Sequence, residues 1–198
     1  MRHALPVLVA AVLAGPAFAQ ATYDIDSSHS SVQFSVRHLM ISNVRGEFSK
    51  VTGTVFYDPA KPEAARIEAS IDANTINTRE PKRDDHLRGP DFFDTAKYPS
   101  ITFKSKSTTV AGNIWKVKGD LTMHGVTREV VLDVEQPAEQ KDARGNLRLG
   151  ATATTRINRK DWGLTWNRVL ETGGVTVGDE VSITIDIEAV RRKTNSSN

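Results

Sequence analysis

Apolar and polar residues alternate with a period of two along most of this chain. In the stretch from Ala65 to Ala73, every odd-numbered residue is apolar, and the residues between them include Arg66, Glu68 and Asp72. Such alternation is typical of a β-strand with one dry and one solvated face. Similar stretches predict about eight strands, near residues 32–38, 44–57, 65–73, 101–106, 115–124, 130–135, 147–157 and 181–189.

The stretch 44–57 changes phase part-way along. Its apolar positions are even-numbered from Val44 to Phe48 and odd-numbered from Val51 to Tyr57. A strand changes faces only where it gains an extra residue, so a β-bulge is expected near Ser49 and Lys50. Residues 23–29, before the first expected strand, are interpreted as a polar lead.

Residues 79–96 interrupt the alternation and predict one short helical insert. Pro81 suits the first turn of a helix, Asn77 or Thr78 can cap it, and Gly89-Pro90 ends it. Phe92 and Phe93 follow, and two adjacent aromatics in a sheet protein have to be buried, most simply at the open end of a rolled sheet. The insert is therefore expected to form either a plug or a doorway at that end.

The connections between the expected strands are mostly short and polar, and no long helix or internal repeat interrupts them. This pattern favours an all-β, antiparallel sheet over an α/β fold, and it fits a closed barrel and a two-sheet sandwich equally well. Small residues on the expected inner face favour a barrel that holds one small ligand. These residues are Gly46, Gly53, Ala69, Ala73, Gly119, Ala151 and Ala153.

A long connection between the last two expected strands, residues 158–180, shows little strand alternation. Loops of this length are more often functional than idle, so it is predicted to form a lid or rim that carries Trp162 and Trp166. The alternative is an aromatic corner that packs beneath this segment.

The first residues predict an exported protein. Residues 1–19 combine a short basic start, an apolar run too short to span a bilayer, and Ala17-Phe18-Ala19 before Gln20, the pattern of a cleaved signal peptide. The barrel is then expected over 20–190, followed by a flexible tail over 191–198. The chain has no cysteine, which excludes a lipoprotein anchor, disulfides and cysteine-ligated metals. A formal net charge of +2 gives no argument for nucleic-acid binding.

Several short motifs, in this order, resemble the YceI-like family. They are Tyr23-x-x-Asp26-x-x-His29-Ser30, Phe34-x-x-x-His38, Val44-x-Gly46-x-Phe48, Asp91-Phe92-Phe93-Asp94, Tyr98-Pro99-x-Ile101-x-Phe103, Gly119-x-Leu121-Thr122-x-His124-Gly125-Val126-Thr127, Arg159-x-Asp161-Trp162-Gly163 and Val177-Gly178-Asp179-Glu180-Val181. Each motif is weak alone, but the ordered set is specific and runs from about Tyr23 to Glu188. Trp162 departs from the pattern, which more commonly has Phe there.

The resemblance implies a lipocalin-like barrel with an apolar tunnel that binds a polyisoprenoid or a similar long-chain lipid, usually in the bacterial periplasm. An isoprenoid quinone or a fatty-acid-like lipid would suit the same tunnel, and no further cofactor is expected. The membrane is expected to take part only transiently, as the source of the lipid, and a homodimer is left open.

The tunnel wall is expected from the inward positions of the strands and from the aromatics of the two irregular segments. These residues are Val32, Phe34, Val36, Phe48, Ile71, Phe92, Phe93, Phe103, Leu121, Leu149, Trp162, Trp166, Ile183 and Ile185. The alternative for each is ordinary packing in the core. A charged head group would need fixed donors near the loops. The candidates are His38, Arg45, Arg83, His86 and Arg88.

No catalytic residue is assigned, because no motif of hydrolases or metalloenzymes is present. His29, His38, His86 and His124 lack the spacing of a metal site, and no Gly-x-Ser-x-Gly occurs. Two alternatives to a lipid carrier remain at this point. One is a metal-dependent enzyme in which the histidines meet in space with Asp85 or Asp94, and the other is a protein-interaction module with a packed barrel.

Overall fold

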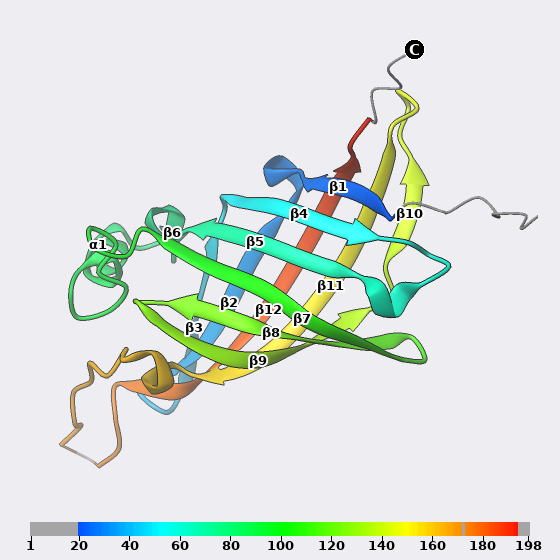
Figure 1. Cartoon of the computed structure of the whole chain (residues 1–198). Helices are drawn as coiled ribbons and strands as arrows, with labels where there is room; N and C mark the ends of the chain where they lie inside the picture. The colour runs from blue at the N-terminus through cyan, green and yellow to red at the C-terminus, as the bar shows by residue number, and fades with distance from the viewer. Residues whose placement is uncertain (1–19, 172, 194–198) are drawn as a thin grey trace, which may run out of the picture.

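The chain forms an antiparallel β-barrel in a computed structural model that describes residues 20–171 and 173–193 (Figure 1). The strands are β1 (Ala21–Ile25), β2 (Ser31–His38), β3 (Ser42–Phe48), β4 (Val51–Tyr57), β5 (Arg66–Asp72), β6 (Ile76–Asn77), β7 (Ser100–Ala111), β8 (Ile114–Met123), β9 (Val126–Glu135), β10 (Ala138–Lys141), β11 (Leu147–Asn158) and β12 (Val177–Arg191). The helical segments are α1 (Pro81–Arg88) and the 3-10 turns η1 (Ser27–His29), η2 (Pro62–Ala64), η3 (Ala73–Thr75) and η4 (Arg159–Trp162). The expected signal peptide and residues 194–198 of the expected tail lie outside the described residues.

Backbone pairing closes the sheet into an eight-stranded ring in the order β11-β9-β8-β7-β5-β4-β1-β12, since β11 pairs again with β12. Its neighbours all run antiparallel, and the β11–β12 pairing extends from Arg148–Val190 to Asn158–Glu180. The predicted all-β barrel with one short helical insert is therefore confirmed.

Two strand positions of the barrel are each occupied by two consecutive pieces. β1 and β2 lie end to end along the same edge of β12, and η1 separates them. Next to them, β4 pairs with β1 while β3 pairs with β2, so the expected continuous strand over 44–57 is two strands. The phase change at Ser49 and Lys50 is thus a break between strands rather than a bulge, because the exposed pair turns the chain from one piece to the next.

The residues before η1 are a strand rather than a polar lead. β1 pairs with β4 on one side and with the end of β12 on the other, and Tyr23 is only 1% exposed. The alternation of this segment is hard to recognise because it is short and carries acids on both sides of Ile25.

Tight turns join the long hairpins, in line with the short connections expected from the sequence. His124 and Gly125 connect β8 to β9 with φ angles of 51° and 73°, the left-handed backbone of a two-residue hairpin turn. Gly112 and Asn113 connect β7 to β8 at the opposite end of the barrel.

The connection between β11 and β12 is shorter than expected, because β12 already begins at Val177. It covers residues 159–176 and lies at the same end of the barrel as α1 (Figure 1). No helix within the part of the chain that the structure describes is long and apolar enough to cross a membrane.

The barrel interior contains two clusters of buried side chains, one toward each end. Tyr23, Tyr57 and Trp115 belong to the cluster away from α1. Phe48, Ile101 and the aromatic ring of Trp162 belong to the cluster beside α1.

Candidate ligand-binding cavity

An apolar cavity of about 230 Å³ runs inside the barrel between the two ends. Apart from Thr155 and Arg159, its wall consists of apolar and aromatic side chains, most of them from the strands of the barrel and some from the insert and the loops. Ile183, Ile185 and Ile187 of β12 point into it and are only half-buried, because the interior beside them is hollow. At about 24 cal/mol per Å³, an unfilled space of this size would cost on the order of 5 kcal/mol, so it is a feature that a binding function would explain.

Most of the predicted wall residues line this cavity. They are Val32, Phe34, Val36, Phe48, Ile71, Phe92, Phe93, Phe103, Leu121, Leu149, Ile183 and Ile185. Their contact with a ligand stays a prediction. Trp162 and Trp166 were expected in the wall but lie outside it.

Two of the small inner residues leave no open space, contrary to the expectation that they widen the barrel. A Cβ added to Gly46 would lie 2.5 Å from the Phe34 ring, and one added to Gly119 would lie 2.5 Å from the Phe103 ring. These glycines therefore make room for large neighbours on the adjacent strands. The alanines Ala69, Ala151 and Ala153 do line the cavity.

The insert is fixed to the barrel by hydrogen bonds at its start. The side chain of Glu80, rather than Asn77 or Thr78, caps α1 by accepting from the Lys82 amide. The buried Asp84 carboxylate accepts from the backbone N–H of Thr78 at 2.8 Å and from its hydroxyl at 2.5 Å. Gly89 ends the helix as expected. This arrangement places Leu87, the residue on the next turn, in the cavity wall.

Phe92 and Phe93 connect the insert to both the barrel and the long loop. The Phe93 ring lies edge-on to Phe48 of β3, with 5.5 Å between ring centroids. The Phe92 ring lies 5.3 Å from that of Trp166, and His86 lies 5.0 Å from Trp166 in an edge-on contact. The insert and the loop 159–176 thus meet over one end of the cavity.

Arg159, which was not among the candidates, is the charged residue of the cavity wall. It is 4% exposed, and its guanidinium donates to the carbonyls of Gly178 at 2.9 Å, Trp166 at 3.0 Å and Val177 at 3.4 Å, and also to that of Leu164. Burial lowers its pKa, and Asp179 at 3.5 Å opposes this effect. The arginine therefore ties the first half of the loop to the start of β12. Its position in the Arg159-x-Asp161-Trp162-Gly163 motif was the available signal.

Trp162 is a core residue beneath the loop, in line with the alternative stated for it. It is 2% exposed, and its indole N–H donates to the carbonyl of Leu121 at 3.1 Å. Its own carbonyl lies 3.1 Å from His124 Nδ1 in the β8–β9 turn. Trp166 is half-buried and packs on the insert from outside the cavity wall, because its ring faces His86 and Phe92.

The five head-group candidates do not converge on one point. Arg83 donates to the Thr78 hydroxyl and carbonyl at 2.8 Å each, and Arg88 pairs with Asp85 at 2.7 Å, so both stabilise the insert. His86 lies 2.8 Å from Asp91. His38 ends β2 opposite Ser42 and Val177. Arg45 faces a polar groove on the outer surface, because its even-phase neighbours in β3 occupy the inner face.

The end of the barrel away from α1 is closed by aromatic side chains. The rings of Tyr57 and Trp115 lie 6.1 Å apart, and the hydroxyl of Tyr23 donates to the carboxylate of Glu139 in β10. Burial, reinforced by Glu139, raises the pKa of Tyr23. The tyrosine therefore stays neutral and keeps its proton on this contact.

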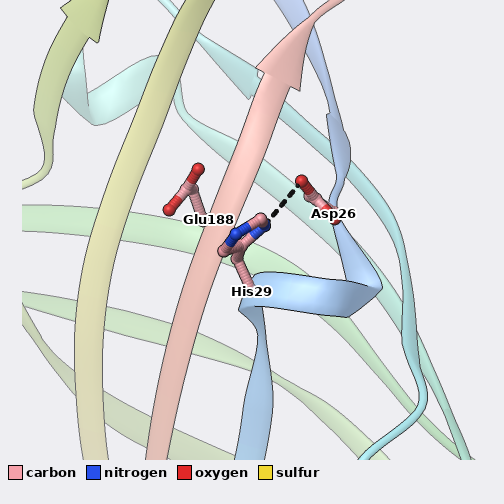
Figure 2. A group of neighbouring side chains, drawn as sticks. All are labelled: Asp26, His29 and Glu188. Atoms are coloured by element: carbon pink, nitrogen blue, oxygen red, sulfur yellow. Dashed lines mark hydrogen bonds and ion pairs between the residues drawn. The ribbon is translucent and has the colours of Figure 1, made fainter. Parts of the chain in front are cut away.

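The histidines are spread over separate elements and do not form one site in the described residues. His29 is in η1, His38 ends β2, His86 is in α1 and His124 is in the β8–β9 turn. Figure 2 shows a different group, in which His29 lies beside Asp26 and Glu188, with ligand-type atoms within 4.8 Å of one another. Arg148 already pairs with both carboxylates, at 3.0 Å from Asp26, so this group is an ion-pair network that joins β1, β11 and β12.

Comparison with known proteins gives a family match over nearly the whole described chain. Residues 23–189 match the family described as YceI-like domain. A UPF0312 protein of Staphylococcus aureus strain N315 is 38% identical over 167 residues, which cover 84% of this chain and 95% of that protein.

Two solved structures share the fold. BcnA of Burkholderia cenocepacia superposes with a TM-score of 0.73 at 28% identity, over 84% of this chain and 99% of that one. A structure from Saccharophagus degradans, described as a polyisoprenoid-binding domain implicated in plant cell wall breakdown, has a TM-score of 0.65 at 17% identity. It covers 87% of this chain and all of its own, and at this identity the likeness concerns the fold alone.

Proposed function

The chain belongs to the YceI-like domain family, and from this we propose that it is a periplasmic carrier that holds one long-chain lipid inside the barrel. The observation that carries the proposal is the closed barrel with a cavity wall that is apolar except at two side chains. The description of the Saccharophagus degradans structure as a polyisoprenoid-binding domain supports a polyisoprenoid, or an isoprenoid quinone, as the ligand class.

Apolar burial is sufficient to bind such a ligand. Each buried CH₂ contributes about 0.8 kcal/mol, so a few isoprene units outweigh the several kcal/mol lost on association. The branched methyl groups of an isoprenoid match a wall of Val, Ile, Leu and Phe. Binding of the isoprenoid tail needs no covalent step and no hydrogen-bond partner. The ligand enters at the α1 end, because Val36, Leu87 and Phe93 there are half-buried, whereas Tyr23, Tyr57 and Trp115 close the other end.

A native mass spectrum of the protein purified from a periplasmic fraction tests the carrier proposal directly. The expected mass is that of residues 20–198 plus one lipid, which organic extraction then identifies. The same spectrum checks the location, because cleavage before Gln20 requires export. A full-length protein in the cytoplasmic fraction would contradict the location, and a barrel that neither contains nor takes up a prenyl lipid would contradict the ligand.

Substitution within the cavity tests whether the lipid lies where we place it. Ala151→Trp adds an indole to the inner face of β11 and is expected to abolish binding of one equivalent of farnesol, measured by native mass spectrometry. Thr154→Trp adds the same side chain to an exposed position of the same strand and should bind like the wild type. Undiminished uptake by a folded Ala151→Trp protein would exclude this cavity as the site.

A metal-dependent activity is the second candidate, and one observation bears on it. The group Asp26, His29 and Glu188 has ligand-type atoms close together, but Arg148 supplies the charge that a metal ion would bring. The proposed carrier function therefore rests on the cavity and assigns these residues a structural role.

A further inference from the structure

Exposed apolar side chains gather at the tips of two neighbouring loops. Leu39, Met40 and Ile41 form the turn between β2 and β3 and are 36%, 53% and 78% exposed, and Val169 in the loop 159–176 is 84% exposed. Among the described residues, the other large apolar side chains with comparable exposure are Ile114 and Val131, which lie on other elements. We refer to Leu39, Met40, Ile41 and Val169 as the apolar tip.

The backbone holds these side chains outward. Leu39 and Met40 have φ angles of 49° and 61°, a left-handed conformation that apolar residues rarely adopt. The turn is nevertheless fixed, because Arg37 Nε donates to the Met40 carbonyl at 3.2 Å and the Leu39 N–H donates to the Thr176 carbonyl at 2.8 Å. A strained turn that exposes three apolar residues is costly unless something covers them.

The two loops form one surface. The N–H of Thr176 donates to the carbonyl of Arg168 at 2.9 Å, so Thr176 links the β2–β3 turn to the residue before Val169. A Cβ at Gly174 would lie 3.4 Å from Met40 Cγ, which places the Met40 side chain against the same loop.

This surface lies directly beside the end where the ligand enters in the proposed function. Val36 and Val177 line the cavity. Val36 lies two residues before His38 at the end of β2, and His38 pairs with Val177, so both cavity residues are close to the start of the turn. Figure 1 shows the β2–β3 turn and the loop 159–176 at the same end of the barrel as α1.

The local charges favour an anionic surface. Arg37 precedes the turn and Arg168 precedes Val169, and both are exposed. The loop 159–176 also contains Arg159 and Lys160 and the acids Asp161 and Glu171, so the basic side chains of the two segments outnumber the acidic ones. The Trp166 ring under Arg168, at 5.7 Å, is a side chain that partitions into the interface of a bilayer.

A second copy of the chain fits less well. Four side chains on two narrow loops present well under the roughly 800 Å² per partner that a stable protein interface buries.

We propose that the apolar tip docks the barrel on the surface of an anionic lipid bilayer, so that the cavity end faces the membrane from which the lipid is taken. This proposal rests on the proposed carrier function. The side chains of Met40, Ile41 and Val169 enter the headgroup region, and Arg37 and Arg168 pair with lipid phosphates.

Vesicle flotation tests the docking. The wild type is expected to float with vesicles of equimolar phosphatidylethanolamine and phosphatidylglycerol, and more weakly with phosphatidylcholine alone. A double variant, Met40→Asp with Ile41→Asp, should bind the mixed vesicles at least about tenfold more weakly, since it replaces two buried apolar contacts by charge. Asp tolerates the left-handed backbone at position 40, so the turn should still form. Ile114→Asp, at an exposed turn of the opposite end, is the matched control and should bind like the wild type.

Farnesol uptake from solution separates failure of the docking from failure of the carrier function. The double variant should take up farnesol as the wild type does, because the tip is not part of the cavity wall. Equal flotation of the wild type and the double variant, or no flotation of the wild type, would overturn the docking. A wild type that dimerises in solution and separates on this double substitution, with vesicle binding unchanged, would assign the tip to a second copy instead. Failure of all proteins to bind farnesol would refute the carrier function alone.

Discussion

Arg159 shows how a single residue can carry a charge at the edge of an apolar cavity. Transfer of an unpaired cation into such surroundings is costly, but backbone carbonyls from the first half of the loop 159–176 and from the start of β12 accept its N–H groups. The same contacts satisfy carbonyls that would otherwise be buried without a donor. The residue therefore stabilises the loop and is unavailable to bind a head group while the loop keeps this conformation.

Replacement of Arg159 by Met is expected to lower the free energy of unfolding by about 3 kcal/mol, because it leaves several buried carbonyls without donors. Urea denaturation measures this change, and hydrogen exchange should become faster at the amides of residues 164–178. Lys160→Met is the control, because Lys160 makes only an exposed ion pair with Asp179 and should change stability by less than about 1 kcal/mol. Equal effects of the two variants would refute the role of Arg159.

At the scale of elements, the insert is a short helix held in place by its first residues rather than by its own helical propensity. An eight-residue helix is marginal in isolation. Asp84 fixes its start to the Thr78 segment that follows β6, and Leu87 and Phe93 then bury their side chains in the cavity wall. The buried carboxylate of Asp84 therefore helps to hold the insert over the end of the cavity.

Asp84→Ala should destabilise the protein by about 2 kcal/mol, because the Thr78 amide and hydroxyl lose their acceptor. Limited proteolysis is expected to cut the variant first within residues 79–96. Its neighbour Asp85 is exposed and pairs only with Arg88, so Asp85→Ala should stay within about 0.5 kcal/mol of the wild type. A cleavage pattern identical to that of the wild type in Asp84→Ala would contradict this account.

The elements that depend on local pattern were predictable, and those that depend on distant partners were not. Alternation identified seven of the eight strands of the ring but not β1, and Gly89-Pro90 identified the end of the helix. Alternation did not show that β3 and β4 are separate strands, because the break at Ser49-Lys50 is set by their different partners β2 and β1.

The wall residues on strands were predictable from local alternation, because every second residue of a strand in a closed barrel faces the interior. The positions of Trp162 and Trp166 were not predictable, because residues outside strands show no alternation. Trp162 is held by a hydrogen bond to Leu121, and Trp166 by its contact with His86. Arg159 was missed because its acceptors are carbonyls that converge only in three dimensions.

At the scale of the whole molecule, Arg148 links the segments where β11 and β12 close the barrel. It pairs with Asp26 after β1, Asp142 before β11 and Glu188 in β12. Hydrogen bonds from Ser28, His29 and Arg148 hold the pKa of Asp26 well below its usual range. Those from Asn146, with a further contribution from Arg148, lower the pKa of Asp142 to about 2. The pKa of Arg148 itself is raised by the same partners.

Acid should therefore weaken the ion pairs of Arg148 and lower the stability of the barrel. The unfolded chain takes up these protons near pH 4, before the folded protein does. The contribution of Asp26 and Asp142 to stability is accordingly complete above about pH 4 and is lost progressively as the pH falls through about 2. Denaturation midpoints measured from neutral pH to about pH 2 should show this decline.

Arg148→Met should be less stable at neutral pH and should show a shallower decline in acid, because the carboxylates have already lost their cation. Arg156→Met, on the same strand but in an exposed pair with Glu180 at 3.7 Å, should keep the wild-type slope. A decline of equal steepness in Arg148→Met and the wild type would exclude Arg148 as the basis of the acid response.

The pairing of β1 and β2 with β12 also constrains the order in which the barrel can fold. Tyr23 pairs with Arg191 and Val32 with Ile185, so one edge of each of the first two strands stays unpaired until the last strand is made. Until β12 appears, the hairpins from β3 to β9 can form an open sheet with unpaired edges, a state prone to aggregation. The barrel is thus closed by its final fifteen-residue strand. A chain that lacks this strand has no enclosed interior, so the completion of β12 sets the moment at which the cavity first exists.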